Sequence, residues 1–363
     1  MPMKYLYRAV DTSAKGGISV DELNRPTLSD VAREAGLSVS AASLILNDIP
    51  DSGLSAESRK KVLESAQKLG YRPNRLAKAL KTDKTGTIGF ISDSVVTTRF
   101  ASGLIKGALK SASITDQVLM VLETMGTEEG MKRCINTALD HHVDAIIIAA
   151  MTAKTILLPK IPKSTNVVLL NSVNAHYQNS ILPDEYEGGR SAMNILIESG
   201  FTENIALIGK NYDVESNTYK SVTVSKRMAG IFDICKENGI KFKSEVVCEN
   251  WEPADGYSAV RNLLESNKKI DALLCMNDRL AIGAYRAIRE IGLSIPDDIS
   301  IVSFDHDDFS ELLRPTLTTV GLPHEKMGEK AVFLANNPDL DDEVLVPMPV
   351  FMGGSISQRK LKL

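Results

Sequence analysis

The sequence contains no apolar run approaching the roughly 20 residues of a membrane-spanning helix, and its N-terminus lacks the apolar core of a secretory signal. Among 363 residues there are only one tryptophan and four cysteines, and no two cysteines form a C-x-x-C pair. Scattered cysteines are typical of reduced, buried thiols rather than of a metal site or a disulfide framework. We therefore expect a cytoplasmic protein that binds no metal and no membrane.

Motifs of the common doubly wound enzymes are also missing. The chain has no G-x-S-x-G elbow, no G-x-x-x-x-G-K-[ST] loop, no G-x-G-x-x-G and no H-E-x-x-H. The acidic runs at 305–308 and 339–343 lack the ligand spacing of zinc or calcium motifs and are expected to be solvated loops. The sequence thus predicts a protein that is not an enzyme and has no cofactor.

Positive charge is slightly outnumbered overall, with 42 Lys and Arg against 46 Asp and Glu, but it is concentrated in one segment. The net charge of −4 by itself argues against a nucleic-acid partner. Residues 25–84, however, carry eleven Lys or Arg and seven Asp or Glu, a balance of +4, whereas residues 85–363 carry −8. A basic segment attached to an acidic body is typical of a head that contacts phosphates.

Two short helices joined by a tight turn are predicted at the start of this basic segment. Thr27, with Asp30 three residues later, resembles a capping box, and Gly36 is a natural helix stop. Ser38 then begins a second helix over residues 39–47. Such a pair is either a helix-turn-helix, whose second helix fits the major groove, or a hairpin that only packs.

A third helix would complete a small headpiece over residues 25–71. Ser55 is expected to cap residues 56–69, whose inner face would carry Val62, Leu63, Ala66 and Leu69. Residues 72–86, which include Pro73, would form a hinge helix and linker. Residues 1–24 show no periodicity and are expected to be a flexible extension.

From Thr87 onward, continuous apolar strands alternate with amphipathic helices, which predicts parallel sheets covered on both faces. The alternation occurs in two series, so we expect two similar doubly wound lobes. The first would comprise about 87–184 plus 321–338 and the second about 185–320 plus 340–354, followed by a tail at 355–363. The predicted strands are 87–92, 118–122, 145–149, 167–170, 205–209, 246–248, 272–276 and 299–304.

The headpiece residues Asp30-Val31-Ala32, Ala35-Gly36, Leu46-Asn47 and Leu69 to Asn74 resemble the LacI/GalR family of bacterial transcriptional regulators. The resemblance extends to about Gly354, through Ser303-Phe304-Asp305 and 315–320. It implies an all-α helix-turn-helix headpiece with a hinge helix, followed by an α/β body of two doubly wound lobes like periplasmic binding proteins. It also implies a repressor of a carbohydrate operon that binds a near-palindromic operator as a homodimer or tetramer.

The resemblance implies specific DNA contacts. Base edges would be read by Val39, Ser40 and Ser43, phosphates would be bound by Thr27, Ser29, Ser38, Asn47, Tyr71 and Asn74, and the hinge would contribute Ala77 and Leu80. Leu80 would wedge into the minor groove. The family usually has Thr-Val-Ser-Arg where this chain has Ala41-Ala42-Ser43-Leu44, so an arginine that contacts a base is replaced by leucine.

The resemblance also implies an effector site between the lobes. Its residues would be Asp93, Phe100, Arg227, Trp251, Asn277 and Asp305, most of which follow the carboxyl ends of predicted strands. Carboxylate, amide and guanidinium groups around an aromatic face suit a sugar. A purine or a phosphorylated partner protein remains an alternative effector. A solute-binding protein is a further alternative, but it would need a signal peptide and no headpiece.

Overall fold

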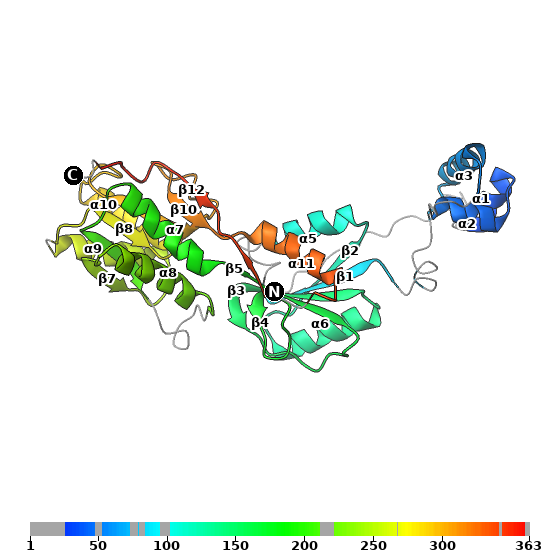
Figure 1. Ribbon diagram of the computed structural model, residues 1–363, viewed down its shortest axis with the longest axis horizontal. Coiled ribbons are helices and arrows are strands. Elements are labelled where there is room, and N and C mark those ends of the chain that lie inside the picture. Colours follow the sequence, from blue (N-terminus) through cyan, green and yellow to red (C-terminus); the bar gives the residue numbers. More distant parts are fainter. Residues whose placement is uncertain are drawn as a thin grey trace, which may run out of the picture. The chain divides into compact units, whose positions relative to one another are not determined.

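The computed structural model describes residues 26–47, 53–72, 79, 84–94, 102–210, 221–266, 268–340 and 343–359. The predicted extension, the hinge residues Asn74, Ala77 and Leu80, and the predicted effector contact Phe100 lie outside these ranges. The chain divides into two compact units, Met1–Thr82 and Asp83–Leu363 (Figure 1).

Within its described residues 26–47 and 53–72, the first unit forms the helices α1 (Leu28–Ala35), α2 (Val39–Leu46) and α3 (Ala56–Leu69). The predicted caps are confirmed: Thr27 and Asp30 form a capping box, Gly36 adopts the left-handed conformation, and the Ser38 and Ser55 hydroxyls accept bonds from the second and third helices. The helices share a small core, which comprises Val31, Ala32, Ala42, Ile45, Val62 and Ala66.

One inner-face prediction is wrong. Leu63 is 50% exposed, whereas its neighbour Val62 is fully buried. Val62, Ser65, Ala66 and Leu69 follow the helical spacing of one face, and Leu63 falls outside that narrow stripe.

The second unit contains two sheets, as the prediction of two lobes implied, and each sheet has six described strands. The first sheet has the order β11-β5-β4-β3-β1-β2, and all its strand pairs are parallel. Alternate residues of β1 and β3 face opposite helix layers, since Phe90 and Ile147 pack with α5 and α11 while Ile91 and Ile148 pack with α6. Its elements are β1 (Thr87–Ser92), α5 (Ser102–Ile114), β2 (Val118–Glu123), α6 (Glu128–Asp140), β3 (Ala145–Thr155), β4 (Asn166–Val173), β5 (Ser180–Pro183), α11 (His324–Ala335) and β11 (Glu343–Val346).

The second sheet has the order β12-β10-β9-β8-β6-β7, parallel except for β12. The sheet and the helices that cover it share one large core, which includes Trp251, the one tryptophan of the sequence. Its elements are α7 (Glu185–Glu198), β6 (Ile205–Lys210), α8 (Val224–Glu237), β7 (Ser244–Val247), α9 (Pro253–Glu265), β8 (Ala272–Cys275), α10 (Asp278–Glu290), β9 (Ser300–Asp305), β10 (Thr318–Gly321) and β12 (Val350–Phe351).

The structure differs from the predicted lobe division at one strand. Residues 340–354 were expected in the second lobe, but β11 pairs with β5 in the first sheet. The physical reason is that α11, which directly precedes β11, packs in the first lobe. The chain therefore adds β11 to the edge of the first sheet before it returns to the second sheet as β12. All four cysteines are buried as free thiols, as expected. Within the described ranges, none of the helices is long and apolar enough to cross a bilayer.

Candidate functional site

The first candidate site is the helix-turn-helix of the headpiece. Val39 and Ser40 are exposed at the start of α2, and Ser43 is half-buried one turn later. Thr27, Ser29 and Ser38 are exposed around the amino-terminal ends of α1 and α2, where backbone N–H groups favour phosphate oxygens. Tyr71 packs partly against the small core, and the Asn47 amide donates to the Ser43 carbonyl oxygen at 2.8 Å.

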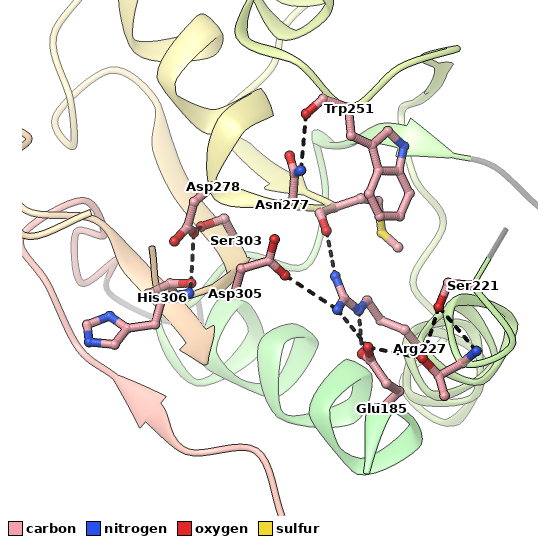
Figure 2. Close-up of polar contacts among 12 residues, drawn as sticks. Glu185, Ser221, Arg227, Trp251, Asn277, Asp278, Ser303, Asp305 and His306 are labelled. Atoms are coloured by element: carbon pink, nitrogen blue, oxygen red, sulfur yellow. Dashed lines mark hydrogen bonds and ion pairs between the residues drawn. The ribbon is translucent and has the colours of Figure 1, made fainter. Parts of the chain in front are cut away.

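The second candidate site lies at the carboxyl edge of the second sheet, where the loops after β7, β8 and β9 meet α7 and α8 (Figure 2). Its centre is the Arg227 side chain on α8, which is only 3% exposed. The Arg227 Nη2 atom lies 3.6 Å from Asp305 Oδ1, and Nη1 donates to the Met276 carbonyl oxygen at 2.6 Å. The guanidinium also lies over the Phe304 ring, 4.3 Å from its centroid.

Sequence reasoning missed the main partner of Arg227, which is Glu185 at the start of α7. Arg227 Nε lies 2.5 Å from Glu185 Oε2 and Nη2 lies 2.8 Å from Oε1, so the contact is a two-point fork. Although burial lowers the pKa of Arg227, the charges of Glu185 and Asp305 raise it overall. An acidic residue in the first turn of a helix is ordinary in sequence terms, so no local signal could have identified Glu185.

Two glycines allow this pair to form. A Cβ at Gly189 would lie 2.2 Å from the Arg227 carbonyl oxygen, and one at Gly230 would lie 2.0 Å from the Tyr186 carbonyl oxygen. Helices α7 and α8 therefore approach backbone to backbone, which brings the Glu185 and Arg227 side chains together across their shared interface.

Asp305 occupies a strained backbone position. Its φ of 102° lies in the left-handed region, which a residue with a side chain rarely adopts, and His306 follows with φ of 55°. The bend is held by a bond from the His306 amide to Thr319 Oγ1 at 3.2 Å and by one from the Leu322 amide to the Asp305 carbonyl oxygen at 3.1 Å. Burial raises the pKa of Asp305 to about 6, against the lowering effect of Arg227.

The neighbouring Asp278, the first residue of α10, is fully buried and ties the same bend to the sheet. Its carboxylate accepts bonds from the Ser303 hydroxyl, the Thr319 hydroxyl at 2.8 Å and the Asp307 amide at 2.8 Å. Burial raises the pKa of Asp278 to about 7, helped by the charge of Asp305 and opposed by these donors. The cap of α10 is the preceding residue, Asn277.

The remaining predicted effector residues are partly engaged by the protein itself. Asn277 is buried, accepts from the Leu280 amide at 2.8 Å and donates to the Trp251 carbonyl oxygen at 3.1 Å. Trp251 is buried in the second-lobe core. Asp93, after β1 of the first sheet, pairs with Lys154 and accepts from the Met151 amide at 3.1 Å. The structure thus brings Arg227, Asp305, Asn277 and Trp251 to one edge, with Asp93 on the other sheet.

Comparisons with known proteins bear on both sites. Residues 27–74 match the model of bacterial regulatory proteins, lacI family, and residues 193–354 match a periplasmic binding protein-like domain. The transcriptional regulator RegA of Clostridium saccharobutylicum is 30% identical over 325 residues, which cover 87% of this chain and 94% of RegA. The repressor PurR of Pasteurella multocida is 30% identical over 85% of this chain and 90% of PurR.

Catabolite control protein A of Priestia megaterium is also 30% identical, over 89% of this chain and 96% of its own length. Among solved structures, a Lac repressor dimer bound to operator and an anti-inducer matches with a TM-score of 0.68 and 24% identity. That match covers 92% of this chain and 100% of the repressor chain, and it supports the fold.

Proposed function

This chain belongs to the LacI family of bacterial transcriptional regulators, and on that basis we propose that it represses a carbohydrate uptake or utilisation operon in response to a sugar. It would act in the cytoplasm as a homodimer, with two headpieces on a near-palindromic operator. The observation that carries the effector proposal is the strained Asp305, whose side chain is 31% exposed beside a buried arginine that the protein itself engages.

The charges at this edge favour a neutral, hydroxyl-rich ligand. All three nitrogen atoms of Arg227 already contact protein oxygens of Glu185, Met276 or Asp305. A phosphate or carboxylate would have to displace Glu185 from a buried pair, which is costly. A sugar hydroxyl, in contrast, can donate to the accessible Asp305 carboxylate without breaking that pair.

Asp305 also provides a route from the ligand to the first lobe. Its carbonyl oxygen bonds to Leu322, which leads directly into α11 of the first lobe, and the ring of His306 stacks on Phe351 at 3.5 Å. A ligand that binds the Asp305 carboxylate and moves it would also move two connections between the lobes. One is the segment from β10 to α11, and the other is the segment from β11 to β12. Effector and operator binding would then be coupled through one conformational equilibrium.

The test is thermal unfolding of the full-length protein with neutral mono- and oligosaccharides, sugar phosphates and purines. A ligand at one hundred times its dissociation constant stabilises the folded state by about 2.7 kcal/mol. We expect stabilisation by one neutral sugar, which Asp305→Asn should abolish and the exposed neighbour Asp308→Asn should retain. Stabilisation by a purine alone, or by no small molecule, would instead favour a purine or a phosphorylated partner protein as effector.

A further inference from the structure

The exposed side of α2 has an unusual composition for a helix that reads DNA. Between Val39 and Leu46 there is no Lys, Arg, Asn, Gln, Asp or Glu. Ala42 and Ile45 are buried in the headpiece core, whereas Val39 is 46% exposed and Leu44 is 37% exposed. At about 100° per residue, the residues Val39, Ser43, Ser40 and Leu44 follow one another across an arc of about 140°.

This arc cannot make the usual two-point contacts with a purine. Such contacts need an arginine or lysine for guanine, or an asparagine or glutamine for adenine. The amide at the end of α2, Asn47, bonds to the Ser43 carbonyl oxygen at 2.8 Å, and the Ser38 hydroxyl accepts from the Ala41 amide at 3.1 Å. What remains on the arc is two hydroxyls flanked by two aliphatic side chains.

We propose that Val39 and Leu44 recognise the C5-methyl groups of thymines, so that the operator half-site facing α2 carries thymine at the positions they contact. This inference rests on the proposed DNA-binding role of α2. An aliphatic side chain in the major groove contacts the thymine methyl and nothing comparable on the other bases. Phosphate affinity would come from other residues of the headpiece, notably Thr27, Ser29 and Ser38 at the amino-terminal ends of α1 and α2, so that attraction to DNA and base selection are carried by different side chains.

The experiment begins with selection of bound sequences from a random duplex library by the full-length protein. Each thymine of the selected half-site is then replaced by deoxyuridine, which removes only the methyl group, and the dissociation constant is measured at fixed salt. Burial of one methyl group corresponds to about a fourfold change in affinity. We expect about fourfold weaker binding for each contacted thymine, and we expect Leu44→Ala to bind thymine and deoxyuridine equally at the position that Leu44 reads.

Two further variants make the test specific. Leu63→Ala removes another exposed leucine of the headpiece, on α3, and should keep the full sensitivity to deoxyuridine. Leu44→Arg should shift the selected base at that position from thymine to guanine, because arginine donates to the two guanine acceptors. If the protein selects and tightly binds an operator, but neither deoxyuridine nor Leu44→Ala changes the affinity, the methyl proposal is wrong and the DNA-binding role of α2 still holds. Failure to enrich any sequence would overturn the DNA-binding role on which it rests.

Discussion

Removal of Glu185 should expose how strongly the buried ion pair holds the second lobe together. Glu185 and Arg227 are 4% and 3% exposed, and two nitrogen–oxygen contacts of 2.5 and 2.8 Å join them. Loss of one member of such a pair leaves a buried charge and typically costs about 3–5 kcal/mol. Glu185→Ala should lower the free energy of unfolding by about 3 kcal/mol, the lower end of that range. The reason is that Arg227 retains Asp305 at 3.6 Å and the Met276 carbonyl oxygen.

Arg227→Ala should cost more, because within the described residues the buried Glu185 carboxylate then keeps a single side-chain bond, from the Thr223 hydroxyl at 3.4 Å. The double variant Glu185→Leu/Arg227→Met, which fills the space with apolar groups, should cost less than either single change. The assay is urea unfolding of the full-length protein followed by the fluorescence of Trp251, the one tryptophan, which lies in the second-lobe core. The coupling energy from the cycle of Glu185→Leu, Arg227→Met and their combination should be at least about 2 kcal/mol.

A matched control lies on the same two helices. Arg190 of α7 and Glu237 of α8 also form a two-point pair, at 2.9 and 3.2 Å, but Glu237 is 53% exposed. Glu237→Ala should therefore cost no more than about 1 kcal/mol. Equal costs for Glu185→Ala and Glu237→Ala, or costs of the Glu185 and Arg227 variants that simply add, would refute the claim that burial makes the inner pair essential.

Two other predictions concern the body and the hinge. Because the pKa of Asp278 is raised to about 7 in the folded state, the folded protein binds the proton more tightly than the unfolded chain does. The stabilisation of the folded state by protonated Asp278 is complete below about pH 4 and is lost as pH rises toward 7. Relative to Asp278→Asn, the wild-type free energy of unfolding should fall by up to about 4 kcal/mol over that range in urea titrations, and parallel pH profiles would contradict this. Leu80→Ala, in the hinge outside the described residues, should weaken operator binding about tenfold or more while effector-induced stabilisation persists; unchanged operator affinity would contradict the wedge.

The headpiece and the alternation of strands and helices could be predicted from the sequence because their signals are local. A capping box spans four residues, and an apolar strand or an amphipathic face repeats within one element. The strands β5, β10, β11 and β12, each two to four residues long, were not predicted. The pairing of β11 with β5 joins segments about 160 residues apart, and no local pattern encodes such a contact.

The candidate effector site shows a different limit of prediction from sequence. An asparagine at the end of a strand can serve a ligand or the fold, and here Asn277 bonds to Leu280 and Trp251 with both ends of its amide. Arg227 is likewise engaged by Glu185, 42 residues earlier in the chain. An arginine at position 227 is compatible with binding a ligand or with pairing inside the protein. Only the close approach of α7 to α8 decides between these two roles. The Asp305 side chain keeps 31% exposure, and the backbone bend at that residue is held by the His306 amide, which donates to Thr319 Oγ1, and by the Leu322 amide, which donates to the Asp305 carbonyl oxygen. Selectivity at this edge should therefore depend on what can donate a hydrogen bond to a carboxylate rather than on what an arginine attracts.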